Sequence, residues 1–119
     1  MKKQTAPSLT SKTLESSVVR EVQQILDLYR LPIYRTNTGA VKVEKRLVRF
    51  GKTGTGDFTG WCQYTGRHVE IECKRPVGGV LSEAQRRRLD AINKAGGVGI
   101  VVTSGADCLA QLKEAGVIR

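Results

Sequence analysis

The stretch GDFTGWCQYTGRHVEIECKRP, residues 56–76, decides the fold. It contains two runs with strand-like composition, 57–64 and 67–75. The pair Thr65-Gly66 separates them, and such small turn-forming residues between two strand-like runs predict a β-hairpin. The hairpin is therefore the starting point for placing the rest of the chain.

Polar and apolar side chains alternate along the second strand of this hairpin. The apolar set is Val69, Ile71 and Cys73, and the polar set is Glu70, Glu72 and Lys74. Because successive side chains in a strand point to opposite faces, we expect one face toward the core and one with two acids and a lysine. The simplest interpretation of the polar face is contact with water. The alternative is a covered face, on which the charges need partners.

The remaining segments are typical of one α/β domain. Helices are predicted over 14–30, 82–95 and 105–116, and further strands over 32–37, 45–51 and 98–104. The last strand is almost wholly apolar, so we expect it to be buried on both faces. The sequence predicts a mixed central β-sheet flanked by helices, in the order α-β-β-β-α-β-α when the strand at 45–51 is left out of the core. Residues 1–12 are expected to form a flexible basic arm, and 13–119 the single domain.

Charge and cysteine content narrow the classes of function. Lysine and arginine total 20 against 11 acids, and a net charge of +9 favours a polyanionic partner such as nucleic acid. A generic basic domain or a membrane-surface protein is the alternative. The three cysteines (Cys62, Cys73 and Cys108) include no CxxC pair, so we expect free thiols in a cytoplasmic protein. No apolar stretch approaches the ~18 residues that span a bilayer, so we expect no membrane partner.

Asp57 opens the first strand of the hairpin, where its carboxylate can approach Glu72 on the second. Neighbouring carboxylates repel each other unless a cation lies between them, and hard oxygen ligands select Mg²⁺, Mn²⁺ or Ca²⁺. Lys74, two residues after the acid, can orient a water or stabilise charge in a transition state. The pattern indicates metal-assisted hydrolysis of a phosphodiester.

Two further polar residues are open to two interpretations each. Glu15 lies within the apolar sector of the first predicted helix, either as a first-turn acid favoured by the helix dipole or as an acid that reaches the metal. Gln85 follows Ser82 by three residues, so it either closes a capping box or faces the site. The residues alone leave both questions open.

Five segments in this order resemble the virus-type replication-repair nuclease family (VRR-NUC), a branch of the PD-(D/E)xK nuclease superfamily. They are LESSVVREVQQIL (14–26), YRTNTG (34–39), GTGDFTG (54–60), VEIECKRPVGGVLSEAQRRRL (69–89) and GGVGIVVTSGADCLAQL (96–112). The resemblance covers residues 14 to 112, most of the chain. Glu70 falls outside the family pattern.

The resemblance implies a restriction-endonuclease-like core with a metal-dependent nuclease site. Its metal ligands for Mg²⁺ or Mn²⁺ would be Asp57, Glu72, Glu15 and the backbone carbonyl of Cys73. Lys74 would be the catalytic lysine, and Gln85 would complete the catalytic set. Arg35 and Asn37 would lie near the site or the DNA. We also expect Lys52 and Arg75, two of the basic residues, to contact DNA.

Stand-alone members of this family are typically viral, homodimeric nucleases that act on branched DNA such as four-way junctions. The resemblance therefore implies a homodimeric, structure-specific DNA endonuclease in the cytoplasm, or in the host cytoplasm if the source is viral. One alternative is a nuclease of the same fold that acts on flap, nicked or linear DNA. Another is a non-catalytic basic DNA-binding module.

Overall fold

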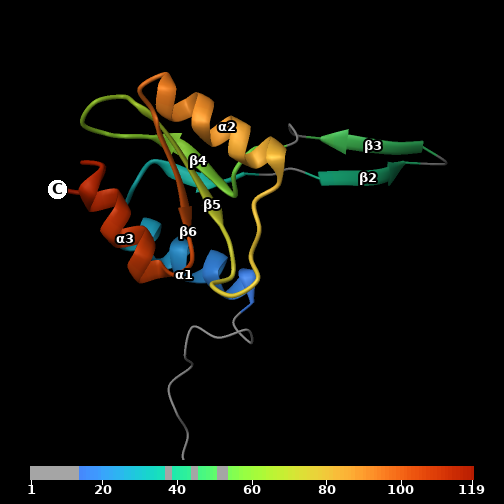
Figure 1. The fold of residues 1–119 in the computed structure, drawn as a ribbon, viewed down its shortest axis with the longest axis horizontal. Coiled ribbons are helices and arrows are strands. Elements are labelled where there is room, and N and C mark those ends of the chain that lie inside the picture. The colour runs from blue at the N-terminus through green and yellow to red at the C-terminus, as the bar shows by residue number, and fades with distance from the viewer. Residues whose placement is uncertain (1–13, 37–38, 44–45, 51–53) are drawn as a thin grey trace, which may run out of the picture.

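The computed structural model of the chain describes residues 14–36, 39–43, 46–50 and 54–119. Within these ranges, Figure 1 shows helices on both sides of a central sheet. The elements in chain order are α1 (Glu15–Leu28), β1 (Ile33–Arg35), β2 (Gly39–Val43), β3 (Arg46–Phe50), β4 (Phe58–Trp61), β5 (His68–Cys73), α2 (Glu83–Lys94), β6 (Val98–Val102) and α3 (Gly105–Glu114). The predicted arm, residues 1–12, lies outside the described residues.

The central sheet has four strands in the order β1-β4-β5-β6. β1 and β5 each pair with β4 in antiparallel orientation, whereas β6 pairs with β5 in parallel. The prediction of a mixed sheet flanked by helices is confirmed. β2 and β3 form a separate antiparallel hairpin that extends away from this sheet in Figure 1. Sequence reasoning predicted β3 but missed β2.

The register between β4 and β5 decides which side chains meet. Phe58 pairs with Ile71, and Thr59 pairs with Glu70. Continuing this antiparallel register by one residue places Asp57 beside Glu72. Directly opposed side chains on neighbouring strands have Cβ atoms about 4.5–5.5 Å apart, so the two acids are neighbours.

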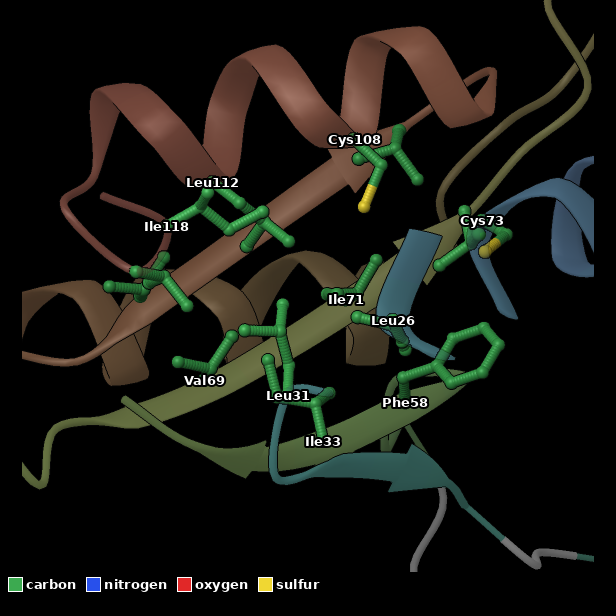
Figure 2. Packing of buried hydrophobic residues seen from close by; sticks show 14 of the residues in the cluster. Leu26, Leu31, Ile33, Phe58, Val69, Ile71, Cys73, Cys108, Leu112 and Ile118 are labelled. Carbon is green, nitrogen blue, oxygen red and sulfur yellow. The ribbon is translucent and has the colours of Figure 1, made fainter. Parts of the chain in front are cut away.

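The apolar core lies between the sheet and the pair α1 and α3. α1 contributes Val18, Val22 and Leu26, spaced by one helical turn, and all three are buried. Figure 2 shows Val69, Ile71 and Cys73 of β5 among the side chains of this cluster, with Cys108 and Leu112 of α3 close by. The prediction that the apolar set of β5 points into the core is confirmed.

α2 covers the other face of β5 and β6. Its only buried residue is Leu89, and its partly buried residues include the polar side chains of Gln85 and Arg88. The polar set of β5 is therefore covered, and the interpretation of a wet strand face is wrong, since Glu70 is 0% and Glu72 is 3% exposed.

The last strand, β6, is less buried than its apolar sequence predicts. The strand at 98–104 was expected to be buried on both faces, but β6 ends at Val102 and its three middle residues are only partly buried. The reason is its position at the edge of the sheet, where β5 is the only strand that pairs with it among the described residues. All three cysteines are free, as expected, and all three are buried.

In the part of the chain that the structure describes, no helix combines the length and the apolar character needed to span a membrane.

Candidate active site

Two acids from neighbouring strands form the centre of the site. The side chain of Glu72 is 4% exposed, and that of Asp57 is 18% exposed. Burial, and then the nearby charge and hydrogen bond of Asp57, raise the pKa of Glu72 to about 8, although Lys74 acts in the opposite direction. Without a cation, the pair therefore retains a proton near neutral pH.

Asp57 is held in place from both neighbouring strands. Its Oδ2 accepts a 2.7 Å hydrogen bond from the backbone N–H of Cys73 on β5. Arg35 of β1 donates through Nη1 to Oδ1 and to the carbonyl oxygen of Asp57, both at 2.9 Å. The backbone N–H of Thr36 donates to the same carbonyl at 2.8 Å. Contacts from β5 and from the end of β1 thus fix both the backbone and the carboxylate of this residue.

Lys74 follows directly after β5 and faces two carboxylates. Its Nζ lies 3.5 Å from Oε1 of Glu72 and 3.7 Å from Oε1 of Glu15. Both distances exceed the usual hydrogen-bond range of about 2.7–3.2 Å, so these are ion pairs without close hydrogen bonds. The Lys74 side chain is only 13% exposed, which strengthens its electrostatic interactions relative to those in water.

Glu15 combines features of both interpretations. It is the first residue of α1 and 47% exposed, as the first-turn interpretation requires. Its carboxylate also faces Lys74, so the helix start brings a third acid to the edge of the site. Its role as a metal ligand stays a prediction.

Gln85 satisfies both of its interpretations at once. Its Oε1 accepts from the backbone N–H of Ser82 at 2.9 Å, and Ser82 Oγ accepts from the Gln85 N–H at 3.1 Å, so the capping box is confirmed. Its Nε2 donates to Oε1 of Glu72 at 2.8 Å. One end of the amide thus caps α2 while the other holds the buried carboxylate.

A pocket of about 500 Å³ opens beside Lys74 and Glu15. Its other lining residues are Leu14, Arg75, Gly78, Gly79 and Val80. A Cβ at position 79 would lie 2.4 Å from the Arg75 carbonyl oxygen and 3.0 Å from Lys74 Cβ, so only glycine lets the loop pack here. The predicted DNA contact Arg75 is exposed at this opening.

The structure brings most of the predicted site residues together. Asp57, Glu72, Lys74, Gln85, Glu15 and Arg35 are linked by the contacts above, and Cys73 contributes its backbone. Asn37 and Lys52 lie outside the described residues. Among the residues that the structure describes, no group of three or more His, Cys, Asp or Glu side chains is arranged to hold a metal ion.

Sequence reasoning missed the partners of Glu70. Its carboxylate accepts from Arg88 Nε at 2.6 Å and Nη2 at 3.0 Å, from the Gly56 N–H at 3.0 Å, and lies 3.0 Å from His68 Nε2. Burial alone would raise the pKa of Glu70, but the hydrogen bonds from Arg88, Gly56 and His68 together lower it. A signal existed, because Arg88 follows Gln85 by three residues and so shares its helix face.

Comparisons with known proteins leave the site to be understood from its own residues. No protein-family model, curated protein or solved structure matches the chain.

Proposed function

We propose that the protein is a Mg²⁺- or Mn²⁺-dependent DNA endonuclease with a restriction-endonuclease-like core. The observation that carries the proposal is the pair of neighbouring acids, buried Glu72 and partly buried Asp57, with Lys74 Nζ 3.5 Å from Glu72. Two like charges on neighbouring strands destabilise a fold, so they are an unfavourable choice for a purely structural position. A divalent cation would turn this repulsion into attraction.

The donor atoms at this position fit a hard cation. The carboxylates of Asp57 and Glu72, with the carbonyl of Cys73, would supply oxygen ligands of the kind that Mg²⁺ and Mn²⁺ prefer. The raised pKa of Glu72 supports this assignment, because burial and the charge of Asp57 outweigh the opposing effect of Lys74. When bound, the ion would supply charge neutralisation at the phosphodiester and a more acidic water.

The protein's own residues have separate tasks in this proposal. Arg35 and the Cys73 N–H orient Asp57, and Gln85 Nε2 orients Glu72. The ammonium group of Lys74 faces the acid pair and can donate to a phosphate oxygen as negative charge develops there. These contacts exist before substrate binds, so the site needs little rearrangement.

DNA is the proposed substrate because the chain is strongly basic, with a net charge of +9. Arg75 and Lys74 line the pocket beside the acids, where a phosphate backbone would meet positive charge. Branched DNA and a homodimer are proposed from the family resemblance. Two symmetric incisions across a four-way junction would use the two sites of a two-fold dimer.

The test is a cleavage assay with the purified protein on labelled four-way junction, flap, nicked and linear duplex DNA. Each substrate is incubated with EDTA, Mg²⁺ or Mn²⁺, beside Lys74→Ala. The proposal expects metal-dependent paired nicks on the junction that Lys74→Ala abolishes. Cleavage of another substrate keeps the enzyme class and replaces the substrate. Salt-sensitive binding without cleavage in any metal contradicts the proposal and favours a binding module.

A further inference from the structure

We infer that Glu70 and Arg88 are positioning residues for Asp57, a role that rests on the proposed nuclease function. A continuous path of contacts leads from α2 to the candidate metal ligand: Arg88 binds Glu70, Glu70 binds the backbone of Gly56, and Asp57 is the next residue in the chain.

The first link is a two-point ion pair whose carboxylate is buried and whose guanidinium is partly exposed. Arg88 donates Nε to Oε2 and Nη2 to Oε1 of Glu70, so each carboxylate oxygen has its own guanidinium donor. Glu70 is 0% exposed. Two parallel hydrogen bonds fix the orientation of the carboxylate as well as its position.

The second link connects this carboxylate to the turn before β4. The backbone N–H of Gly56 donates to Glu70 Oε2 at 3.0 Å. A Cβ at position 56 would lie 2.8 Å from Glu70 Cγ and 2.9 Å from the Ile71 carbonyl oxygen, so only glycine allows this close approach. Fixing the Gly56 peptide also fixes where the backbone of Asp57 begins.

In each of the two polar contacts between α2 and β5, a side chain of the helix donates to a glutamate of the strand. On α2, Gln85 and Arg88 are three residues apart and share a face. On β5, their partners Glu72 and Glu70 are two residues apart and lie on the strand face that α2 covers. Gln85 holds one candidate ligand directly, whereas Arg88 acts on the other through Glu70 and Gly56. α2 therefore holds Glu72 directly and acts on Asp57 only through Glu70 and Gly56.

Stability alone is a weak reason for this pair. A buried ion pair contributes little net stability compared with well-packed apolar side chains of similar volume. Leucine and methionine would fill the space between α2 and β5, but they would leave the Gly56 N–H without its acceptor. An apolar pair thus cannot replace the acceptor that Glu70 offers to the Gly56 N–H.

The test compares two double variants of the full chain. Glu70→Leu with Arg88→Met removes the buried pair and keeps its volume. Glu83→Gln with Arg87→Met removes an exposed ion pair from the same helix and serves as the control. The inference expects the first variant to fold, with kcat about 10- to 100-fold lower and more Mn²⁺ needed for half-maximal rate, as for residues that support metal ligands. KM for DNA stays within about twofold, since the DNA contacts remain.

Two further measurements keep the inference testable. Amide hydrogen exchange reports on Gly56 without any cleavage, and the expected result is faster exchange at Gly56 in the first double variant only. Glu70→Gln retains an acceptor for the Gly56 N–H, so its kcat should lie between the wild type and the double variant. If the double variant does not fold, Glu70→Gln with wild-type kcat and Mn²⁺ dependence overturns the inference.

The failure of this inference differs from the failure of the proposed function. A wild-type protein that cleaves DNA, beside a first double variant with equal kcat, equal Mn²⁺ dependence and unchanged Gly56 exchange, overturns the positioning role only. A wild-type protein that cleaves no DNA in any metal overturns both.

Discussion

The two faces of β5 differ in chemistry although they are buried to the same extent. On the side of α1 and α3, Val69, Ile71 and Cys73 are each 0% exposed, and on the side of α2, Glu70 and Glu72 are 0% and 3% exposed. Burying an apolar side chain stabilises the fold by about 1.5–3 kcal/mol. Burying a carboxylate costs free energy unless partners compensate it. One strand thus supports the fold on one face and the candidate chemistry on the other.

The polar face compensates its two acids unequally. Glu70 is matched by a guanidinium and a backbone donor, and its pKa is lowered. Glu72 has one amide donor and an ammonium group 3.5 Å away, faces Asp57, and its pKa is raised. Two acids on the same strand face therefore have opposite pKa shifts. The protein's own groups compensate the charge of Glu70, whereas a cation would compensate the charge of Glu72.

The largest effect is expected from Asp57→Asn. The account predicts a fall in cleavage rate of about 10³-fold or more, equivalent to about 4 kcal/mol, because a charged ligand is lost where the ion would neutralise the phosphodiester. DNA binding should persist, since the basic surface is unchanged. Single-turnover cleavage and a gel-shift titration measure the two quantities. Cleavage at the wild-type rate would remove Asp57 from the site.

Substitution on the apolar face of β5 should lower stability and leave cleavage nearly unchanged. Ile71→Ala is expected to lower the free energy of unfolding by about 2–5 kcal/mol, because it opens a cavity in the core. Cleavage at a temperature well below the midpoint of unfolding should stay within about threefold of wild type, since no site contact is lost. Denaturant unfolding and a cleavage assay at 10 °C check this. A large loss of activity in a folded variant would show that the two faces are not separable.

Glu72→Gln should stabilise the metal-free protein at high pH. The pKa of Glu72 is raised from 4.5 to about 8 by burial and by Asp57, so the folded state binds the proton more tightly than the unfolded chain. This contribution is complete below pH 4.5 and is lost as the pH rises through 8. In EDTA, the Tm of the variant should exceed that of wild type by roughly 5–10 °C at pH 9, and by much less at pH 5.

A Tm difference between Glu72→Gln and wild type that stays constant from pH 5 to pH 9 would contradict this assignment of the proton. Glu114→Gln, on the last residue of α3, is a suitable control because Glu114 lies outside the acid pair.

The smallest effect is expected from separating the two tasks of Gln85. Gln85→Glu keeps a side chain that completes capping boxes but replaces the amide donor to Glu72 with another acid. Cleavage should fall about tenfold, about 1.4 kcal/mol, and repulsion between the new carboxylate and Glu72 should also lower the free energy of unfolding. Gln85→Ala should lose a similar activity and also about 1 kcal/mol of stability through the cap. Equal activity of wild type and Gln85→Glu would leave Gln85 as a capping residue only.

Local patterns predicted most of the fold and the main acids of the site. The alternation along β5 and the spacing of Ser82 and Gln85 depend on neighbours in the sequence, and both predictions are confirmed. The pairing of Glu70 with Arg88 spans 18 residues and depends on how α2 packs on β5. The position of β6 at the sheet edge likewise depends on strand order, which no local pattern contains.

The most direct test of the central claim is a Mn²⁺ titration of the wild type and of Glu72→Gln, followed by electron paramagnetic resonance and by calorimetry at pH 7.5. The account predicts saturable binding to the wild type with release of a proton, because the acid pair must lose its proton to bind the ion. The variant should bind at least about tenfold more weakly. Equal Mn²⁺ binding by both proteins, or no binding by the wild type, would contradict the claim that this acid pair is a metal site.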